Sequence, residues 1–174
     1  MTEQIDFATE YAPAPESTDH IEIQDRYSLF INGEFTEPTS GKYFPTINPA
    51  NEKALSEIAE ANKADVDQAV KSARNAYENT WSKISANERG KYIYRISRML
   101  QERSREFAVI ESMDGGKPIR ESRDVDIPLA AAHFFYYAGW ADKLEYAFPG
   151  RQANSLGVAG QIIPWNFPLL MAAW

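Results

Sequence analysis

The sequence contains no cysteine and only two histidines, His20 and His133, among its 174 residues. Without cysteine the chain can form neither a disulfide nor a thiolate metal site, and two isolated histidines do not make a metal centre. A thiol nucleophile is excluded for the same reason, because the thiolate is the reactive form of cysteine. We therefore predict no metal-binding site and no covalent catalysis by sulfur within these residues.

Basic residues are missing from the first 25 positions, which hold seven of the 25 acidic residues and no lysine or arginine. The other 18 acidic residues are balanced by 18 basic ones, so the formal net charge of −7 comes from this tail. We expect residues 1–26 to form a disordered or loosely packed acidic tail. An acidic tail on a neutral body favours neither a nucleic acid nor a membrane as partner. The tail also lacks the pattern of a secretory or mitochondrial leader, which indicates a cytoplasmic protein.

Long hydrophobic runs are absent as well. The uncharged, largely apolar run at residues 127–141 has fifteen residues, includes Pro128 and His133, and falls short of the roughly twenty that span a bilayer. We interpret it as a buried helix. With 44% hydrophobic and 13% aromatic residues the chain has material for one sizeable core, so it holds at most one domain.

A standard dinucleotide-binding fingerprint, G-x-G-x-x-G in the turn after a strand, is also missing. Gly157 and Gly160 fall within or before the expected strand, not in the turn after it. The glycines of residues 114–118 precede a lysine, but this segment follows a helical pattern and ends in Pro118. Glycine then proline after a helix is a stop signal, so we interpret the segment as a helix end and not as a phosphate loop.

Local signals predict a hairpin and several helices. Asn32-Gly33 between residues 29 and 35 is a strong hairpin-turn signal, and Pro45 and Pro49 bracket a short extended piece. Apolar residues recur at helical spacing over residues 65–77, and we expect the face containing Val66 and Val70 to pack on a sheet or another helix.

Further helices are predicted downstream. Ser85 followed by Glu88 is a capping-box signature for a second helix, whose apolar stripe continues after a break near Ser104. A fourth helix should span about residues 120–143, with a kink at Pro128.

The last eighteen residues carry the strongest functional signal. Ile162 and Ile163 close a short apolar run of strand type, Pro164 ends it, and Pro168 sits where a first helical residue would be. A buried strand, a turn and a helix start form half of a β-α-β unit, and ligands of open α/β sheets bind beyond the carboxyl ends of the strands.

Asn166 lies in this predicted turn. Its neutral amide has two donors that could stabilise an oxyanion on a carbonyl under attack. Two other interpretations stay open on local grounds, an N-cap of the following helix and a plain turn residue.

Several motifs, in order, resemble those of one family. These are the segments at residues 29–35, 45–50, 114–118, 136–143 and 160–171. The last, Gly-Gln-Ile-Ile-Pro-Trp-Asn-Phe-Pro-Leu-Leu-Met, looks like the signature around the catalytic asparagine of the NAD(P)-dependent aldehyde dehydrogenase superfamily. The resemblance covers roughly residues 27–174, and a nicotinamide dehydrogenase of another type with a similar turn is the weaker alternative.

The resemblance implies an α/β fold, namely the N-terminal part of a Rossmann-like cofactor-binding domain with an edge hairpin, helices and the first β-α-β strand. Residues 27–174 would form this partial domain, in which residues 144–156 are a shortened link where relatives have an oligomerisation arm. It also implies an NAD or NADP cofactor, a small-molecule aldehyde substrate and a homo-oligomer for the full-length protein.

The resemblance assigns roles to eight residues. Asn166 would be catalytic as the oxyanion donor, and three further residues match a substrate tunnel: Phe167, Met171 and Trp174. The residues that would line the cofactor cleft are Ile162, Ile163, Pro164, Trp165 and Asn166. The family's cysteine nucleophile and glutamate base would lie beyond Trp174, so we expect the 174-residue chain alone to be inactive. The alternative is an inert truncated product that acts, if at all, by associating with a full-length homologue.

Overall fold

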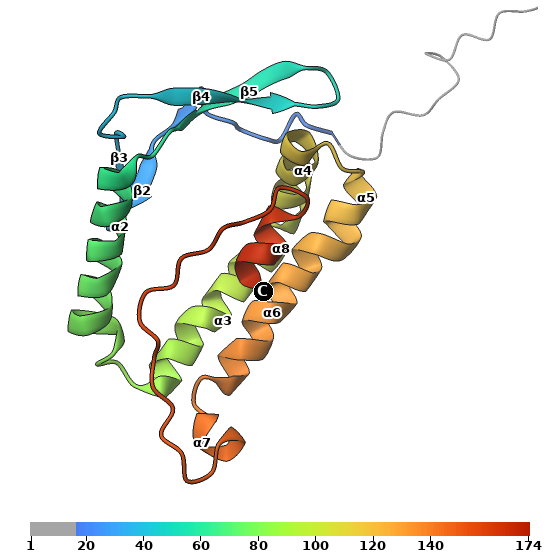
Figure 1. Ribbon diagram of the computed structural model, residues 1–174. Helices are drawn as coiled ribbons and strands as arrows, with labels where there is room; N and C mark the ends of the chain where they lie inside the picture. Colours follow the sequence, from blue (N-terminus) through green and yellow to red (C-terminus); the bar gives the residue numbers. More distant parts are fainter. Residues whose placement is uncertain (1–16) are drawn as a thin grey trace, which may run out of the picture.

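Two small sheets lie at one end of the computed structural model, which describes residues 17–174 (Figure 1). In the first sheet, β1 (Arg26–Tyr27) pairs in parallel with β5 (Lys53–Ala59), and β5 pairs in antiparallel fashion with β4 (Tyr43–Asn48). The second sheet is a hairpin of β2 (Leu29–Ile31) and β3 (Glu34–Thr36). The expected acidic tail lies outside the described residues up to position 16.

The hairpin turn has the predicted sequence and geometry. Asn32 and Gly33 both have positive φ angles, 57° and 83°, as the tight turn between two twisted strands requires. Phe30 and Phe35 face each other across the strands with ring centroids 5.1 Å apart. The extended piece near Pro45 is also confirmed as β4, whereas β5 has no counterpart among the predicted elements.

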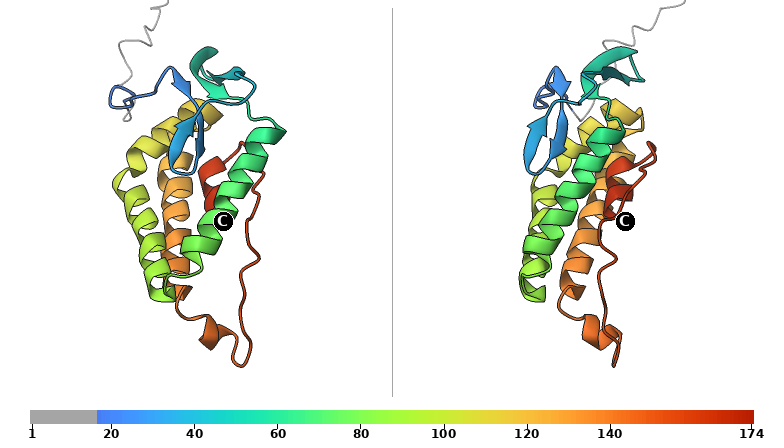
Figure 2. Two further views of the ribbon diagram at one scale, coloured as in Figure 1. Left: turned by 90° about the vertical axis from the view of Figure 1, so that its left-hand side faces the viewer. Right: turned by 60° about the vertical axis from the view of Figure 1, so that its left-hand side comes forward.

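Most of the remaining regular structure is helical, as Figure 2 shows from two further sides. They are α2 (Lys63–Ala76), η1 (Tyr77–Trp81), α3 (Ala86–Glu102), α4 (Ser104–Gly115), α5 (Ile119–Glu121), η2 (Ser122–Asp126), α6 (Ile127–Trp140), α7 (Leu144–Ala147) and α8 (Pro168–Ala173). Both η segments are π-helical. None of the helices in residues 17–174 is long and apolar enough to cross a membrane.

The helix ends follow local chemistry. The Asn62 side chain accepts hydrogen bonds from the backbone of Ala64 and Asp65, which caps α2. Ser85 caps α3 by accepting from the backbone N–H of Glu88, as predicted. The break near Ser104 is confirmed because α3 ends at Glu102 and α4 begins at Ser104.

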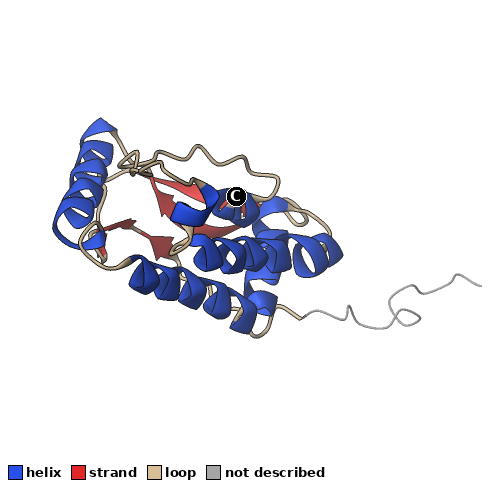
Figure 3. Ribbon diagram, turned by 90° about the horizontal axis from the view of Figure 1, so that it is seen from below, coloured by secondary structure: helices blue, strands red, loops and turns tan. Residues whose placement is uncertain are grey.

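The core lies between α3 and α6, which run side by side in opposite directions (Figure 1). Figure 3 shows the helices in blue and the strands in red, seen from below. Its buried members include Leu100 of α3 and Ile127 and Ala130 of α6. The Ser97 hydroxyl, fully buried, donates to the carbonyl of Ala131 at 2.8 Å, so the small residues let the two helices approach closely.

Two predicted apolar faces are not covered within residues 17–174. Val66 and Val70 of α2 are 51% and 45% exposed, so the expectation that this face packs on a sheet or helix is wrong for the described chain. The second half of α6 is also open, with Phe135, Tyr136 and Tyr137 each more than half exposed, so α6 is only partly the buried helix predicted. A periodic apolar stripe identifies a face, but burial needs a partner surface that these residues do not supply.

The predicted helix over about residues 120–143 is divided into α5, η2 and α6. Pro128 lies in helical backbone that continues without a break from residue 119 to residue 140, and its missing N–H removes one hydrogen bond to the preceding turn. The wide turn of η2 precedes it, so the irregularity expected at Pro128 is a π-helical segment before the proline.

The strand expected at residues 157–163 is absent. Residues 151–164 have no regular structure and run alongside α2 and back toward α4 and α8 (Figures 1 and 2). Gly157 passes close to the guanidinium of Arg74 in α2. A strand in a parallel sheet requires neighbouring strands to hydrogen-bond with, and none of the described strands lies beside this segment. The prediction of a buried strand ending at Ile163 is therefore wrong here.

Candidate functional site

Asn166 lies in a turn directly before α8. The N-cap position of α8 belongs to Phe167, and no side-chain hydrogen bond caps the helix. The interpretation of Asn166 as an N-cap is therefore wrong. Its side chain is exposed, and within residues 17–174 the carboxamide has no hydrogen-bond partner. The amide donors are thus free to bind a ligand oxygen.

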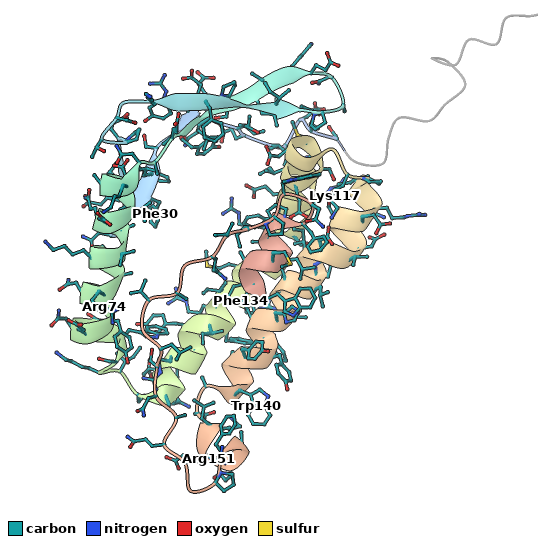
Figure 4. All side chains as sticks on the ribbon, in the orientation of Figure 1. Phe30, Arg74, Lys117, Phe134, Trp140 and Arg151 are labelled. Carbon is teal, nitrogen blue, oxygen red and sulfur yellow. The ribbon has the colours of Figure 1, made fainter. Side chains whose placement is uncertain are left out.

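The backbone of Asn166, in contrast, is anchored. Lys117 donates from Nζ to the Asn166 carbonyl oxygen at 3.1 Å, and the same ammonium lies 5.5 Å from the centre of the Phe167 ring. Figure 4 shows the labelled Lys117 at the upper end of the helices, beside the turn that leads into α8. An electrostatic hydrogen bond and a cation–π contact therefore hold two consecutive residues of the turn.

Two acidic side chains hold Lys117 in turn. Asp126 forms an ion pair and a hydrogen bond with Nζ, and a Glu111 carboxylate oxygen lies 3.7 Å from it. The side chains of Glu111, Asp126 and Lys117 are only 5%, 7% and 17% exposed. We call these three residues the Lys117 cluster.

Glu111 is the member of the Lys117 cluster whose hydrogen bonds are incomplete. Its Oε1 atom is buried without a hydrogen-bond partner. Burial, together with hydrogen bonding to and repulsion by the Asp126 carboxyl, raises the pKa of Glu111 to about 7, while Lys117 and the backbone N–H of Leu169 act in the opposite direction. One ammonium faces two carboxyl groups in a mostly buried place.

Three separate elements bring the Lys117 cluster together. Glu111 lies near the end of α4, and Lys117 follows Gly116, whose positive φ of 71° ends that helix. Asp126 is the last residue of η2, and a hydroxyl pair between Ser112 and Ser122, 3.1 Å apart, joins α4 to η2.

The Lys117 cluster was not predicted from the sequence. Residues 114–118 are a helix end, as predicted, but no role was expected for Lys117. A lysine directly after a helix stop was a visible signal, whereas the pairing with Asp126 depends on tertiary structure.

The residues assigned to the cofactor cleft form an open segment. Ile162, Ile163, Pro164 and Trp165 are exposed, and within the described chain their backbone N–H and C=O groups make no hydrogen bond. Unpaired backbone groups beside apolar side chains are able to receive a ligand with both polar and aromatic parts. The predicted role of this segment in binding the cofactor stays a prediction.

The three predicted tunnel residues share one side of α8, because Phe167, Met171 and Trp174 are spaced four and three residues apart. Trp174 stacks on His133 of α6, with centroids 5.9 Å apart and an angle of 24°. Leu170, which adjoins this side of the helix, is buried and holds α8 against the rest of the chain. Their tunnel role also stays a prediction. Among residues 17–174, no group of three or more acidic or histidine side chains could hold a metal ion.

Comparison with known proteins identifies the family. The model of the aldehyde dehydrogenase family matches residues 35–174, which is most of the chain. The chain is 41% identical over 177 aligned positions to aldehyde dehydrogenase family 2 member B4, mitochondrial, of Arabidopsis thaliana, covering 97% of this chain and 33% of that protein. It is 46% identical to a mitochondrial aldehyde dehydrogenase of Leishmania tarentolae, covering 87% and 32%. The chain belongs to the aldehyde dehydrogenase family.

Solved structures agree with this assignment. The NAD+ complex of an aldehyde dehydrogenase from Bacillus cereus superimposes with a TM-score of 0.77 and 36% identity, over 87% of this chain and 33% of that one. An aldehyde dehydrogenase from Sinorhizobium meliloti gives a TM-score of 0.76 and 30% identity, over 87% and 32%. The predicted fold class, the N-terminal α/β part of an aldehyde dehydrogenase, is thereby confirmed. The chain spans about a third of the length of the relatives it matches.

Proposed function

We propose that the chain is the N-terminal part of an NAD(P)-dependent aldehyde dehydrogenase that oxidises an aldehyde to a carboxylic acid, and that Asn166 is its oxyanion donor. The observation that carries this proposal is the state of Asn166. Its backbone is held by Lys117, while its carboxamide is exposed and makes no hydrogen bond within residues 17–174. A hydrogen-bond donor for a developing negative charge needs this arrangement, in which the backbone is held and the carboxamide is free to bind.

The chemistry of an amide suits the task. The carboxamide N–H groups are neutral, stay protonated at any working pH, and can hydrogen-bond the oxygen of a carbonyl as it gains negative charge. The nucleophile must come from outside this sequence, which has no cysteine, so the chain alone cannot form a thiohemiacetal. In this proposal Asn166 stabilises the tetrahedral oxyanion that a thiolate from the remaining part of the enzyme generates.

The cofactor is proposed to lie against residues 162–166. Their exposed, unpaired backbone groups support this placement, and when bound NAD or NADP would accept the hydride of the aldehyde. A related structure from Bacillus cereus contains NAD+, which favours NAD without distinguishing it from NADP for this chain.

The substrate side is proposed to be α8. Phe167 and Met171 are half-buried and Trp174 is exposed, so this face offers apolar and aromatic surface for an aldehyde. A small-molecule aldehyde, a homo-oligomeric full-length protein and a cytoplasmic location complete the proposal.

The test is Asn166→Ala in the complete protein. Removal of one oxyanion donor should lower kcat about 100- to 1,000-fold, because the interaction is made in the transition state. The Kd for NAD should change little, since the cofactor contacts proposed here are made by the backbone. Stopped-flow or steady-state NADH absorbance measures the first quantity, and fluorescence titration measures the second.

Asn154→Ala is the matched control. Asn154 is also an exposed asparagine in an irregular segment, and its side chain has no hydrogen-bond partner in the described chain. Its replacement should leave kcat unchanged. A kcat for Asn166→Ala equal to that of the control would contradict the proposed role.

A further inference from the structure

We propose that Lys117 is a positioning residue, which holds the backbone of Asn166 in place through the Asn166 carbonyl and is itself held by Glu111 and Asp126. The inference rests on the function proposed for Asn166. It adds residues from a separate part of the chain, since Lys117 and Asn166 are 49 positions apart.

The segment that leads to Asn166 has few other attachments. Within the described chain, residues 158–166 contribute to no helix or strand and make two hydrogen bonds. One joins the Gln161 side chain to the Ala172 carbonyl at 3.1 Å, and the other joins Lys117 to the Asn166 carbonyl. Lys117 therefore makes the hydrogen bond that acts on Asn166 itself.

An anchored carbonyl limits where the side chain of the same residue can begin. The Asn166 carbonyl oxygen belongs to the peptide plane that follows Cα, so an anchored oxygen restricts rotation about the Cα–C bond. Phe167 begins α8 directly afterwards, and its ring faces the same ammonium. With this peptide plane restrained, the Cβ atom of Asn166 stays close to one position, and a displacement of about 1 Å at a reacting group can cost about 100-fold in rate.

The Lys117 cluster is more elaborate than a helix end requires. Gly116 with its positive φ already ends α4, and its N–H already donates to the Ser112 carbonyl. Burying one ammonium with two carboxyl groups carries a desolvation cost, and such ion pairs are often no more stabilising than apolar replacements. A role of Lys117 in holding the turn at Asn166 explains why these charged side chains are buried there.

The two acidic neighbours of Lys117 enclose its ammonium from separate elements. Asp126 bonds Nζ directly, while Glu111 sits 3.7 Å away with one oxygen lacking a hydrogen-bond partner. The two carboxyl groups approach the ammonium from α4 and η2, and the Asn166 carbonyl approaches it from the turn before α8. The ammonium thus has partners from three elements and little freedom to move away from Asn166.

The experiment is Lys117→Met in the complete enzyme, alone and combined with Asn166→Ala. Methionine keeps the apolar length of the side chain and removes the ammonium. We expect kcat to fall about 10- to 100-fold in the otherwise unchanged enzyme, with the Kd for NAD unaltered. In the Asn166→Ala background the same substitution should have little further effect, because the residue it positions is gone.

Lys91→Met is the matched control. Lys91 is also ion-paired, to Glu88, but it lies exposed on α3 with no contact to the turn. It should leave kcat unchanged in both backgrounds. If Lys117→Met does not fold, Lys117→Arg keeps the charge in a different shape and should lower kcat by a smaller factor, again only when Asn166 is present.

Two results would overturn the inference. An unchanged kcat for a folded Lys117 variant, or an equal loss with and without Asn166, would mean that Lys117 does not act through Asn166. These results are distinct from failure of the proposed function, in which Asn166→Ala alone would keep a near-normal kcat.

Discussion

At the scale of single residues, Glu111 shows how burial and charge compete. Its carboxyl group is nearly inaccessible, shares one ammonium with Asp126, and has an oxygen without a hydrogen bond. The pKa of Glu111 is consequently raised from 4.5 to about 7. A proton on Glu111 leaves one carboxylate for one ammonium, whereas its loss adds an unbalanced buried charge.

This shift gives a pH dependence with a definite sign. A carboxyl whose pKa is higher in the folded state stabilises the fold below pH 4.5, and that contribution is lost as the pH rises to about 7 and beyond. Glu111→Gln cannot ionise, so its stability relative to the unaltered protein should improve between pH 5 and pH 8. The gain in free energy of unfolding is at most about 3 kcal/mol. It is followed through the difference in Tm between the two proteins at each pH.

Glu106→Gln provides the control for that comparison. Its hydrogen bond with Arg103 lowers the pKa of Glu106, so its contribution is lost only below pH 4.5. The Tm difference for Glu106→Gln should be the same at pH 5 and pH 8. A Tm difference for Glu111→Gln that is equally constant would refute the shift.

The residues at the site differ in how far the sequence could indicate them. Asn166 stood in a motif with a distinctive order of residue types, so it could be singled out from the sequence. Glu111 and Asp126 belong to no such motif, and Lys117 stands in residues 114–118, where the pattern indicated only a helix end. The contact of these three residues requires α4 and η2 to meet. Distances between elements are not encoded in local periodicity, which is why the Lys117 cluster emerges only in three dimensions.

At the scale of secondary-structure elements, the end of α4 is the most constrained point. A Cβ atom built on Gly116 would lie 2.9 Å from the Cβ of Pro49, and its φ of 71° disfavours other residues. Gly116→Ala should therefore lower the Tm of the complete protein, by the equivalent of about 1–2 kcal/mol or more.

Gly139→Ala is the opposite case in another helix. Gly139 lies inside α6, and no atom lies within 4 Å of a Cβ built on it. Alanine there should raise the Tm, by roughly 0.5–1 kcal/mol of added stability, because it reduces the freedom of the unfolded chain and favours the helix. Thermal unfolding of the two variants side by side checks both signs, and a Tm increase for Gly116→Ala would contradict the argument.

Elements with local signals were predictable and elements that need partners were not. The Asn32-Gly33 turn, the Ser85 cap, the break at Ser104 and the stop at Gly116 are set by residues close in sequence. The expected strand at residues 157–163 depends on neighbouring strands, which the described residues do not place beside it. The division of residues 119–140 by a π-helical segment likewise has no signal in apolar spacing.

At the scale of the whole molecule, much apolar surface remains open. Val66 and Val70 on α2, the aromatic half of α6, and Ile162 and Trp165 near the site are all exposed. Exposed apolar surface of this extent indicates contact with further protein. The chain spans about a third of the length of its relatives. We therefore propose that the remaining part of an aldehyde dehydrogenase covers these faces.

The central claim is that this sequence works as the first third of an aldehyde dehydrogenase, and the most direct test is the intact mass of the polypeptide that carries it in its own cells. The account predicts a product about three times heavier than the 19.7 kDa of these 174 residues, with a cysteine and a glutamate in the additional part. A product of 19.7 kDa would contradict it, because a chain without cysteine cannot supply the nucleophile and Asn166 would have no oxyanion to stabilise.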